Sequence, residues 1–142
     1  MSEDLSGRDL RGHDFTSRDM SGWTLAGAKL TRSTLYRTIL RGADLRGIDA
    51  TGAILFAASA EGADLAGACL ARTNLRGANL SGANLEDADL SGADLHDANL
   101  NEAKLDRAVL SGTILEGKVN LFGATMNGAD LRRVRASGAA LE

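Results

Sequence analysis

A five-residue period runs through almost the whole chain. Every fifth residue between Leu5 and Leu115 is apolar, and most of these residues are leucine. The period shifts by one residue within 116–120 and resumes at Leu121, which makes 28 repeats with one insertion. No stretch of different composition separates two groups of repeats. We therefore expect residues 1–142 to form a single repeat domain.

The period of five excludes the two common regular structures. On an α-helix, a step of five residues turns about 140° around the axis, so the leucines would scatter over all sides. On a continuous strand, side chains alternate between faces, so residues five apart would point in opposite directions. A chain that turns once in each repeat is the remaining solution.

Each position in the repeat has a predictable environment, counted from the leucine as position i. Positions i−2 and i point inward, i−1 and i+1 point outward, and the corner falls at i+1 and i+2. Glycine is frequent at i+2, as at Gly42 and Gly77, where it permits a tight turn. Asp44 and Asn79 are examples at i−1, where short acceptors can bind turn amides. The pattern predicts a coiled solenoid with a continuous interior.

Five consecutive repeats between residues 78 and 100 read Ala-Asn-Leu or Ala-Asp-Leu. In these repeats the chain resembles the pentapeptide-repeat family, whose motif is A(D/N)LXX. The resemblance implies an all-β fold: a right-handed quadrilateral parallel β-helix of about seven four-sided coils, without large helices. With coils about 4.8 Å apart, the rod would be about 34 Å long.

The first coil, within residues 1–25, departs from this motif. Its inward i−2 places hold Glu3, Arg8, His13 and Arg18, where later repeats mostly have alanine. An unpaired arginine costs several kcal/mol to bury, so these side chains suit only an open end. We expect an N-terminal cap in which Glu3 pairs with Arg8 or Arg18 and Trp23 fills the space beneath. The alternative is that this coil is a docking surface.

The last coil, residues 132–142, is also atypical. It has the apolar residues Val134, Ala136 and Leu141 together with Arg132, Arg133 and Arg135. A solenoid leaves an unpaired edge and an open core at each end. We predict that another copy of the chain, as a homo-oligomer, or a different protein covers this end.

Catalytic and metal-binding residues are sparse. His13, His96 and Cys69 fall on different coils of the expected solenoid, so we expect no metal site. The one catalytic alternative is an acid–base pair of His96 with Asp94 or Asp97, for which the sequence offers no nucleophile. Phosphate-binding and dinucleotide-binding motifs are missing too. We expect a protein that is not an enzyme and that has no cofactor.

The formal net charge is −3, from sixteen basic and nineteen acidic residues. This balance gives no strong field, so we do not expect direct binding to nucleic acid or to a membrane. The N-terminus has no basic region followed by an apolar run, and a single cysteine agrees with a reducing compartment. The chain is therefore predicted to be cytoplasmic.

Stacking residues twenty apart places Tyr36 next to Phe56 on the outside of the solenoid. The candidate partner-binding residues around them are Tyr36, Phe56, Ile39, Ile54, Arg37, Arg41 and Arg76. An aromatic and aliphatic patch with an arginine rim has the composition of a protein-binding hot spot. The alternative is that the two rings form a ladder that only stabilises the coils.

A second surface feature is a band of acidic residues. Its members are Glu86, Asp87, Asp89, Asp94, Asp97, Glu102 and Asp106. The resemblance brings an alternative function, because some family members mimic DNA, bind gyrase or topoisomerase IV and protect against quinolones. DNA of the same length would carry roughly twenty charges, far more than the net charge here. A non-enzymatic interaction module is therefore our first hypothesis, and partial DNA mimicry by the acidic band is the second.

Overall fold

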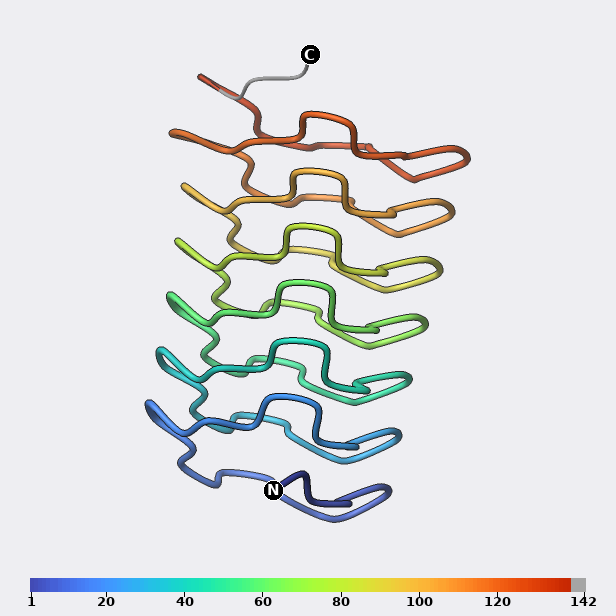
Figure 1. Ribbon diagram of the computed structural model, residues 1–142. Helices are drawn as coiled ribbons and strands as arrows, with labels where there is room; N and C mark the ends of the chain where they lie inside the picture. The colour runs from blue at the N-terminus through green and yellow to red at the C-terminus, as the bar shows by residue number, and fades with distance from the viewer. Residues whose placement is uncertain (139–142) are drawn as a thin grey trace.

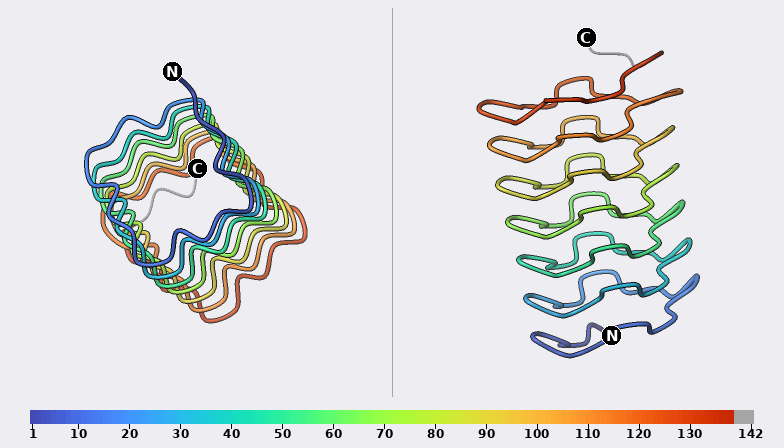
Figure 2. Two further views of the ribbon diagram at one scale, coloured as in Figure 1. Left: turned by 90° about the horizontal axis from the view of Figure 1, so that it is seen from below. Right: turned by 180° about the vertical axis from the view of Figure 1, so that it is seen from behind.

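Each five-residue repeat forms one side of a four-sided coil. The computed structural model describes residues 1–138, and in it the coils stack along one axis as a right-handed β-helix (Figure 1). Seen along this axis, the chain has a four-sided outline that successive coils repeat closely (Figure 2). The expected fold class is thus confirmed.

The coils are held together by parallel β-bridges between residues twenty apart, such as Asp4 with Thr24 and Thr24 with Asp44. Four repeats therefore make one coil, and the described residues make nearly seven. Each side contributes one bridging residue, at position i−1, and residues 1–138 contain neither an α-helix nor a longer strand. Accordingly, no helix within this range could cross a membrane.

Sides and coils are numbered here in chain order. In coil 1, residues 3–22, side 1 is centred on Leu5, side 2 on Leu10, side 3 on Phe15 and side 4 on Met20. Coils 2 to 5 begin at residues 23, 43, 63 and 83, coil 6 spans 103–123, and coil 7 begins at residue 124.

The corners have the geometry that the repeat predicts. Position i+2 adopts a positive φ, as in Gly42 with φ 62°, where glycine avoids a steric penalty. The outward carboxylate at i−1 accepts a hydrogen bond from the backbone of i+1: Thr16 N–H donates to Asp14 Oδ1 at 2.9 Å. These short contacts fix each corner from within its own repeat.

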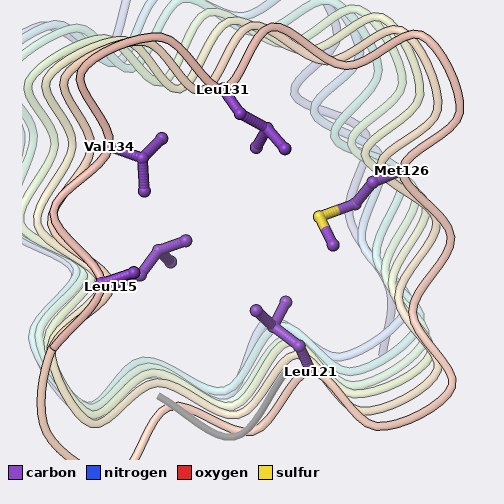
Figure 3. Close-up of a pocket in the computed structure, with 6 residues that line it drawn as sticks. Leu115, Leu121, Met126, Leu131 and Val134 are labelled. Carbon is purple, nitrogen blue, oxygen red and sulfur yellow. The ribbon is translucent and has the colours of Figure 1, made fainter. Parts of the chain in front are cut away.

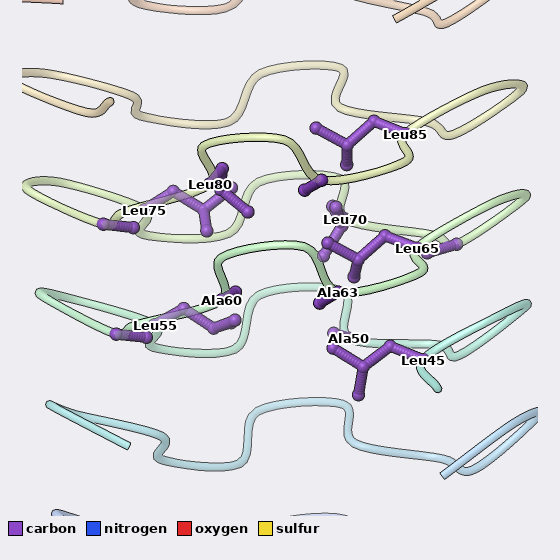
Figure 4. Close-up of a cluster of buried hydrophobic side chains, with 14 of the residues drawn as sticks. Leu45, Ala50, Leu55, Ala60, Ala63, Leu65, Leu70, Leu75, Leu80 and Leu85 are labelled. Carbon is purple, nitrogen blue, oxygen red and sulfur yellow. The ribbon is translucent and has the colours of Figure 1, made fainter. Parts of the chain in front are cut away.

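The interior is a column of leucine and alanine. Leu65 and Ala63, with exposed fractions of 2% and 0%, are typical of positions i and i−2 (Figure 4). Where threonine replaces alanine, its hydroxyl donates to a backbone carbonyl: Thr73 Oγ1 donates to the Leu70 carbonyl at 2.7 Å, and Thr38 Oγ1 donates to the Phe15 carbonyl of the coil below at 2.8 Å. Within the described part of the chain, no buried side-chain polar atom lacks a hydrogen-bond partner. Alanine at i−2 leaves room for the leucines of the coil above and below.

The inserted residue is absorbed at the corner between sides 3 and 4 of coil 6. Bridge partners are twenty residues apart up to Asp94 with Ile114, and 21 apart from Asn99 with Asn120 onward. At this wider corner, Lys118 N–H donates to Asp97 Oδ1 of the coil below at 2.7 Å. A side chain from the neighbouring coil therefore closes the corner.

The first coil is covered by aromatic and cationic side chains. The Arg18 guanidinium lies 5.0 Å from the Trp23 ring centroid, and Trp23 Nε1 donates to the Met1 carbonyl at 3.1 Å. The His13 ring stacks on Phe15 with centroids 6.0 Å apart. Trp23 is buried, as expected for a residue that fills the space beneath a cap.

One detail expected of this coil is wrong. Among residues 1–138, Glu3 forms no ion pair with Arg8 or Arg18. All three side chains are exposed, and an exposed ion pair gains little over hydration. The Arg18 guanidinium instead lies over the Trp23 ring and covers part of its apolar surface.

Candidate protein-interaction surface

Three large apolar side chains gather on side 3 of coils 2 and 3, and we call them the aromatic face: Tyr36, Ile54 and Phe56. Their exposed fractions are 38%, 42% and 37%. The Tyr36 and Phe56 rings stack with centroids 5.7 Å apart and an interplanar angle of 26°. The rings are thus in contact, as a stabilising ladder requires, while part of each side chain stays accessible, as a binding surface requires.

The other candidate residues surround this face unequally. Ile39 is half-buried and lies around the corner on side 4. Arg76, the next residue above Phe56 in the same column, lies 3.4 Å from the Asp94 carboxylate. Arg41 lies 3.4 Å from the Glu61 carboxylate on side 4. Arg37, at the corner beside Tyr36, forms no ion pair with any residue in 1–138.

The acidic band encircles the rod instead of forming one face. Four of its residues lie on the sides: Glu86 and Asp106 on side 1, Asp89 on side 2 and Asp94 on side 3. The other three, Asp87, Asp97 and Glu102, each lie at a different corner. A partner on one side of the solenoid would meet only a few of these carboxylates. The residues of the acidic band are close in the sequence, but the coil places them on different sides of the rod.

Several of these carboxylates also have internal partners. Asp87 accepts two hydrogen bonds from Arg107, at 2.9 and 3.0 Å, and this contact lowers the pKa of the Asp87 carboxyl and raises that of Arg107. The Asn127 backbone N–H similarly lowers the pKa of Asp106. Asp97 closes the wide corner of coil 6. Much of the band therefore serves to hold adjacent coils together.

An apolar cavity opens at the C-terminal end of the described chain, and we call it the apolar end. It has a volume of about 290 Å³ and is lined by Leu115, Leu121, Met126, Leu131, Val134 and Ala136, most of which point toward its centre (Figure 3). Leu131 is 48% exposed, Val134 is half-buried and Ala136 is exposed.

The sequence prediction for this end was incomplete. It named Val134 and Ala136, which line the cavity, and Leu141, which lies outside the described residues. It missed Met126 and Leu131, although both occupy position i of the same coil. The five-residue period already placed both residues inward, so the missing step was to treat the whole inward layer of coil 7 as the exposed end.

A second cavity, of about 360 Å³, is polar and lies on the outside near the same end. It is lined by Ser111, Gly112, Arg132 and Arg133. Arg132 is already held by two hydrogen bonds to Asp130, at 2.8 and 2.6 Å, which lower the pKa of that carboxyl to about 2. The engaged guanidinium is therefore not free to bind an anion in the cavity.

The residues of the suggested acid–base pair, His96 and Asp97, lie close together, but Asp97 also holds a corner of the coil. His96 Nε2 lies 3.5 Å from Asp97 Oδ2, but the other oxygen of this carboxylate binds the Lys118 backbone. Neither of the two cavities above includes His96. Cys69 is half-buried with its Sγ 3.1 Å from Thr51 Oγ1, and residues 1–138 contain no group of three metal-ligating side chains.

Comparison with known proteins agrees with this geometry. The family model described as "Pentapeptide repeats" matches residues 19–55, 61–97 and 78–117, with 8 copies. No curated protein matches the chain significantly. Among solved structures, HetL from the cyanobacterium Nostoc sp. strain PCC 7120 is 32% identical, with a TM-score of 0.56 over 96% of this chain and 71% of HetL. HetL is described as a pentapeptide repeat protein involved in heterocyst differentiation regulation.

A second solved structure is similar in fold. Full-length QnrB1, a plasmid-mediated fluoroquinolone resistance protein, is 20% identical, with a TM-score of 0.55 over 99% of this chain and 92% of QnrB1. At this identity the likeness extends to the fold alone.

Proposed function

The chain belongs to the pentapeptide-repeat family, and we propose that it is a scaffold without catalytic activity that binds another protein through the aromatic face. One observation carries the proposal. Seven large apolar side chains are exposed among the described residues, and three of them, Tyr36, Ile54 and Phe56, lie together on adjacent coils. A contiguous exposed apolar patch on a soluble repeat protein is typical of an interaction site.

The physical properties of the face suit this role. The bridged coils hold the backbone of Tyr36 and Phe56 in place, and the two rings hold each other. A partner that covers the face therefore loses little conformational entropy in ordering it. Rigid aromatic anchors of this kind often contribute about 2 kcal/mol or more each to protein binding. The regulatory role described for HetL suits a binding protein and supports the same proposal.

Affinity purification from native host cells tests the proposal. The bait is the tagged full chain, compared with the Tyr36→Ala/Phe56→Ala double variant and with Ile54→Lys, which places a charge in the face and leaves the ring stack intact. Phe122→Ala is the matched control, because Phe122 is 64% exposed but lies on side 4 of coil 6. We expect a partner that wild type and the control retain and that both face variants lose. Equal recovery by all baits would overturn the proposal.

DNA mimicry has weaker support. The acidic band is spread around the rod, and contacts such as that of Asp87 with Arg107 neutralise part of it. A gyrase supercoiling assay at micromolar protein, with and without a quinolone, separates the two functions. We expect neither inhibition nor protection, and either effect would favour mimicry over the scaffold.

We also propose that a second copy of the chain covers the apolar end. The first coil presents exposed charged side chains such as Arg8, so it is a poor cover for an apolar cavity. Two apolar ends, in contrast, can cover each other about a two-fold axis, which closes the assembly at a dimer.

Light scattering coupled to size-exclusion chromatography tests this pairing. We expect a dimer for wild type and a monomer for Leu131→Glu. Val109→Glu is the control, because Val109 is exposed on side 2 away from the cavity, and it should remain dimeric. A wild-type monomer at high concentration would contradict the pairing and favour a different protein as the cover.

A further inference from the structure

Two arginines flank the aromatic face. Arg32 and Arg37 stand at consecutive corners of coil 2, so they bound the two edges of side 3. Both side chains are exposed, and within residues 1–138 neither has a carboxylate partner. Tyr36 and Phe56 thus lie next to two cations whose charge is not compensated within the described fold.

The two arginines occupy an unfavourable backbone conformation. Their φ angles are 56° and 54°, in the left-handed region that costs free energy for residues other than glycine. Glycine fills the equivalent corner in many repeats, including Gly52 directly above Arg32. Some other non-glycine corners are explained by internal contacts, as Asp87 is by Arg107. Within residues 1–138, Arg32 and Arg37 have no such contact, and the same holds for Arg72 and Arg133. What distinguishes Arg32 and Arg37 is their position at the two edges of the aromatic face.

The Arg32 side chain points along the edge of the face. Its Cγ lies 3.8 Å from the place that a Gly52 Cβ would occupy, so its aliphatic stem runs along the corner toward coil 3. Above Phe56, Arg76 adds a third guanidinium whose side chain is 45% exposed. Cations therefore lie on both edges of the aromatic face and beyond one of its ends.

Carboxylates are missing from the face itself. The outward i−1 positions of side 3 in coils 2 to 4 are Thr34, Ile54 and Asn74. In this column the nearest acidic residues are Asp14 in coil 1 and Asp94 in coil 5. Asp14 is bound to its own turn through Thr16 N–H, and Asp94 is paired with Arg76. The surface that a partner would meet is therefore apolar in the middle and positive at its edges.

We infer that the aromatic face binds an acidic polypeptide segment in which an apolar side chain lies between carboxylates. The apolar side chain covers Tyr36 and Phe56, and the carboxylates bind Arg32 and Arg37. Arg32 and Arg37 are five residues apart, so their Cα atoms can be separated by at most about 17 Å. In an extended partner segment, two carboxylates about five residues apart span the same distance. Arginine is suited to this role because its guanidinium binds carboxylates in a bidentate geometry. The inference rests on the proposed function, since it names the partner of the same face.

Selection from a displayed random twelve-residue peptide library tests the inference. The target is the immobilised full chain, and the best peptide is then labelled and titrated by fluorescence anisotropy. The test variant is Arg32→Glu/Arg37→Glu. The control is Arg133→Glu, because Arg133 is an exposed residue at the same corner of coil 7, with φ 58°, five coils above Arg32.

We expect enriched peptides that carry Asp or Glu on both sides of an apolar residue. Their affinity should fall at least tenfold in the Arg32→Glu/Arg37→Glu variant and should stay unchanged in Arg133→Glu. Raising the salt from 50 to 200 mM should weaken binding severalfold, because exposed charges are screened.

Three outcomes would overturn the inference, and they differ in what they imply for the proposed function. Peptides without acidic residues that need Tyr36 and Phe56 but tolerate the arginine reversal would remove the acidic partner and keep the binding face. Selection that yields no peptide sensitive to Tyr36→Ala/Phe56→Ala would remove both. Tighter binding of a labelled twelve-nucleotide oligothymidylate than of the acidic peptide would replace the polypeptide with single-stranded nucleic acid.

Discussion

The two ends of the solenoid have the same backbone but opposite surfaces. In coil 1, Leu10 and Met20 are 8% and 0% exposed, although within residues 1–138 no coil lies below them. In coil 7, Leu131 is 48% exposed and stands beside an open cavity. The repeat geometry alone therefore does not decide whether the last leucine layer is covered.

The difference arises at position i−2. Near the N-terminal end this position holds large side chains such as Arg18 and Trp23, which extend over the leucines. In coil 7 it holds Ala124 and Ala129 on sides 1 and 2, which are too short to do so. Alanine is favourable inside the stack because the next coil supplies the missing volume. At an end the same residue leaves a cavity.

The largest expected effect is that of removing the cover from the first coil. Trp23→Ala should lower the free energy of unfolding of coils 1 and 2 by about 3–5 kcal/mol, because it deletes a buried indole and its hydrogen bond to Met1. Hydrogen exchange of the bridged Thr24 and Leu25 amides measures this loss. Leu131→Ala should lower the stability of the folded monomer by about 1 kcal/mol or less, since Leu131 is half exposed in the single chain. Equal costs at the two ends would remove the contrast between them.

The second prediction concerns the wide corner between sides 3 and 4 of coil 6. Gly117→Ala should destabilise this part by about 2 kcal/mol, because Gly117 has φ 73° and an added Cβ would overlap the Asp97 carboxylate. Gly112→Ala should cost about 1 kcal/mol, because φ is 69° but the nearest atom is 3.9 Å away. Hydrogen exchange should show the loss in residues 118–135 and leave coil 1 unchanged. A similar loss for both variants would show that the Asp97 contact adds nothing.

A smaller effect is expected for the cation that covers the first coil. Arg18→Ala should cost about 0.5–1 kcal/mol, the usual range for an exposed cation–π contact. Trp23 is the only tryptophan in the chain, so a red shift of its fluorescence would report the loss directly. Arg8→Ala is the control and should leave the emission unchanged. An unshifted spectrum in Arg18→Ala would show that the guanidinium does not shield the ring.

The smallest expected effect is one that the two ends share. Hydrogen bonds from Arg11 and Arg132 lower the pKa of Asp9 and of Asp130, in each case to about 2. Because the folded pKa lies below the unfolded value of about 4, both pairs stabilise the fold above that pH and lose this contribution as the pH falls toward 2. The Asp9 side chain is 51% exposed and that of Asp130 is 24% exposed, so salt should weaken the effect more at Asp9 than at Asp130.

Carboxyl titration by NMR measures both sites in one experiment. We expect the two pKa values to agree within about one unit, and Arg11→Ala should raise that of Asp9 alone. A carboxyl at either end that titrates near its ordinary value would break the symmetry.

The path of the backbone was largely predictable from the sequence. A five-residue period is a local signal, so the inward positions, the corners and the carboxylate contacts of Asp14 could be read repeat by repeat. The contact of Tyr36 with Phe56 needed one further step, the twenty-residue coil that the family resemblance implied. The insertion at 116–120 was visible as a break in period, but its closure by Asp97 was not, because the acceptor comes from another coil.

The charged side chains could not be assigned in the same way. The sequence suggested that Asp94 and Asp97 belong to an acidic band and to an acid–base pair with His96. In the fold, Asp94 pairs with Arg76, and Asp97 lies near His96 but also accepts the Lys118 N–H at the wide corner. Arginine is long and flexible and reaches several acceptors across a corner or an adjacent coil. Some arginines, such as Arg11, bind an aspartate two residues earlier in the sequence, whereas Arg76 and Arg107 bind aspartates that are eighteen and twenty residues away.

The sequence by itself determined the solenoid, its leucine and alanine interior and its glycine-rich corners. It did so because burial at each position follows from the backbone turn within a single repeat. Only the tertiary structure decided which carboxylates are neutralised, that Arg18 covers Trp23, and that Arg32 and Arg37 have no carboxylate partner within residues 1–138, beside an exposed pair of rings. These outcomes depend on contacts between coils. Such contacts are determined by the individual side chains and not by the backbone geometry that every repeat shares.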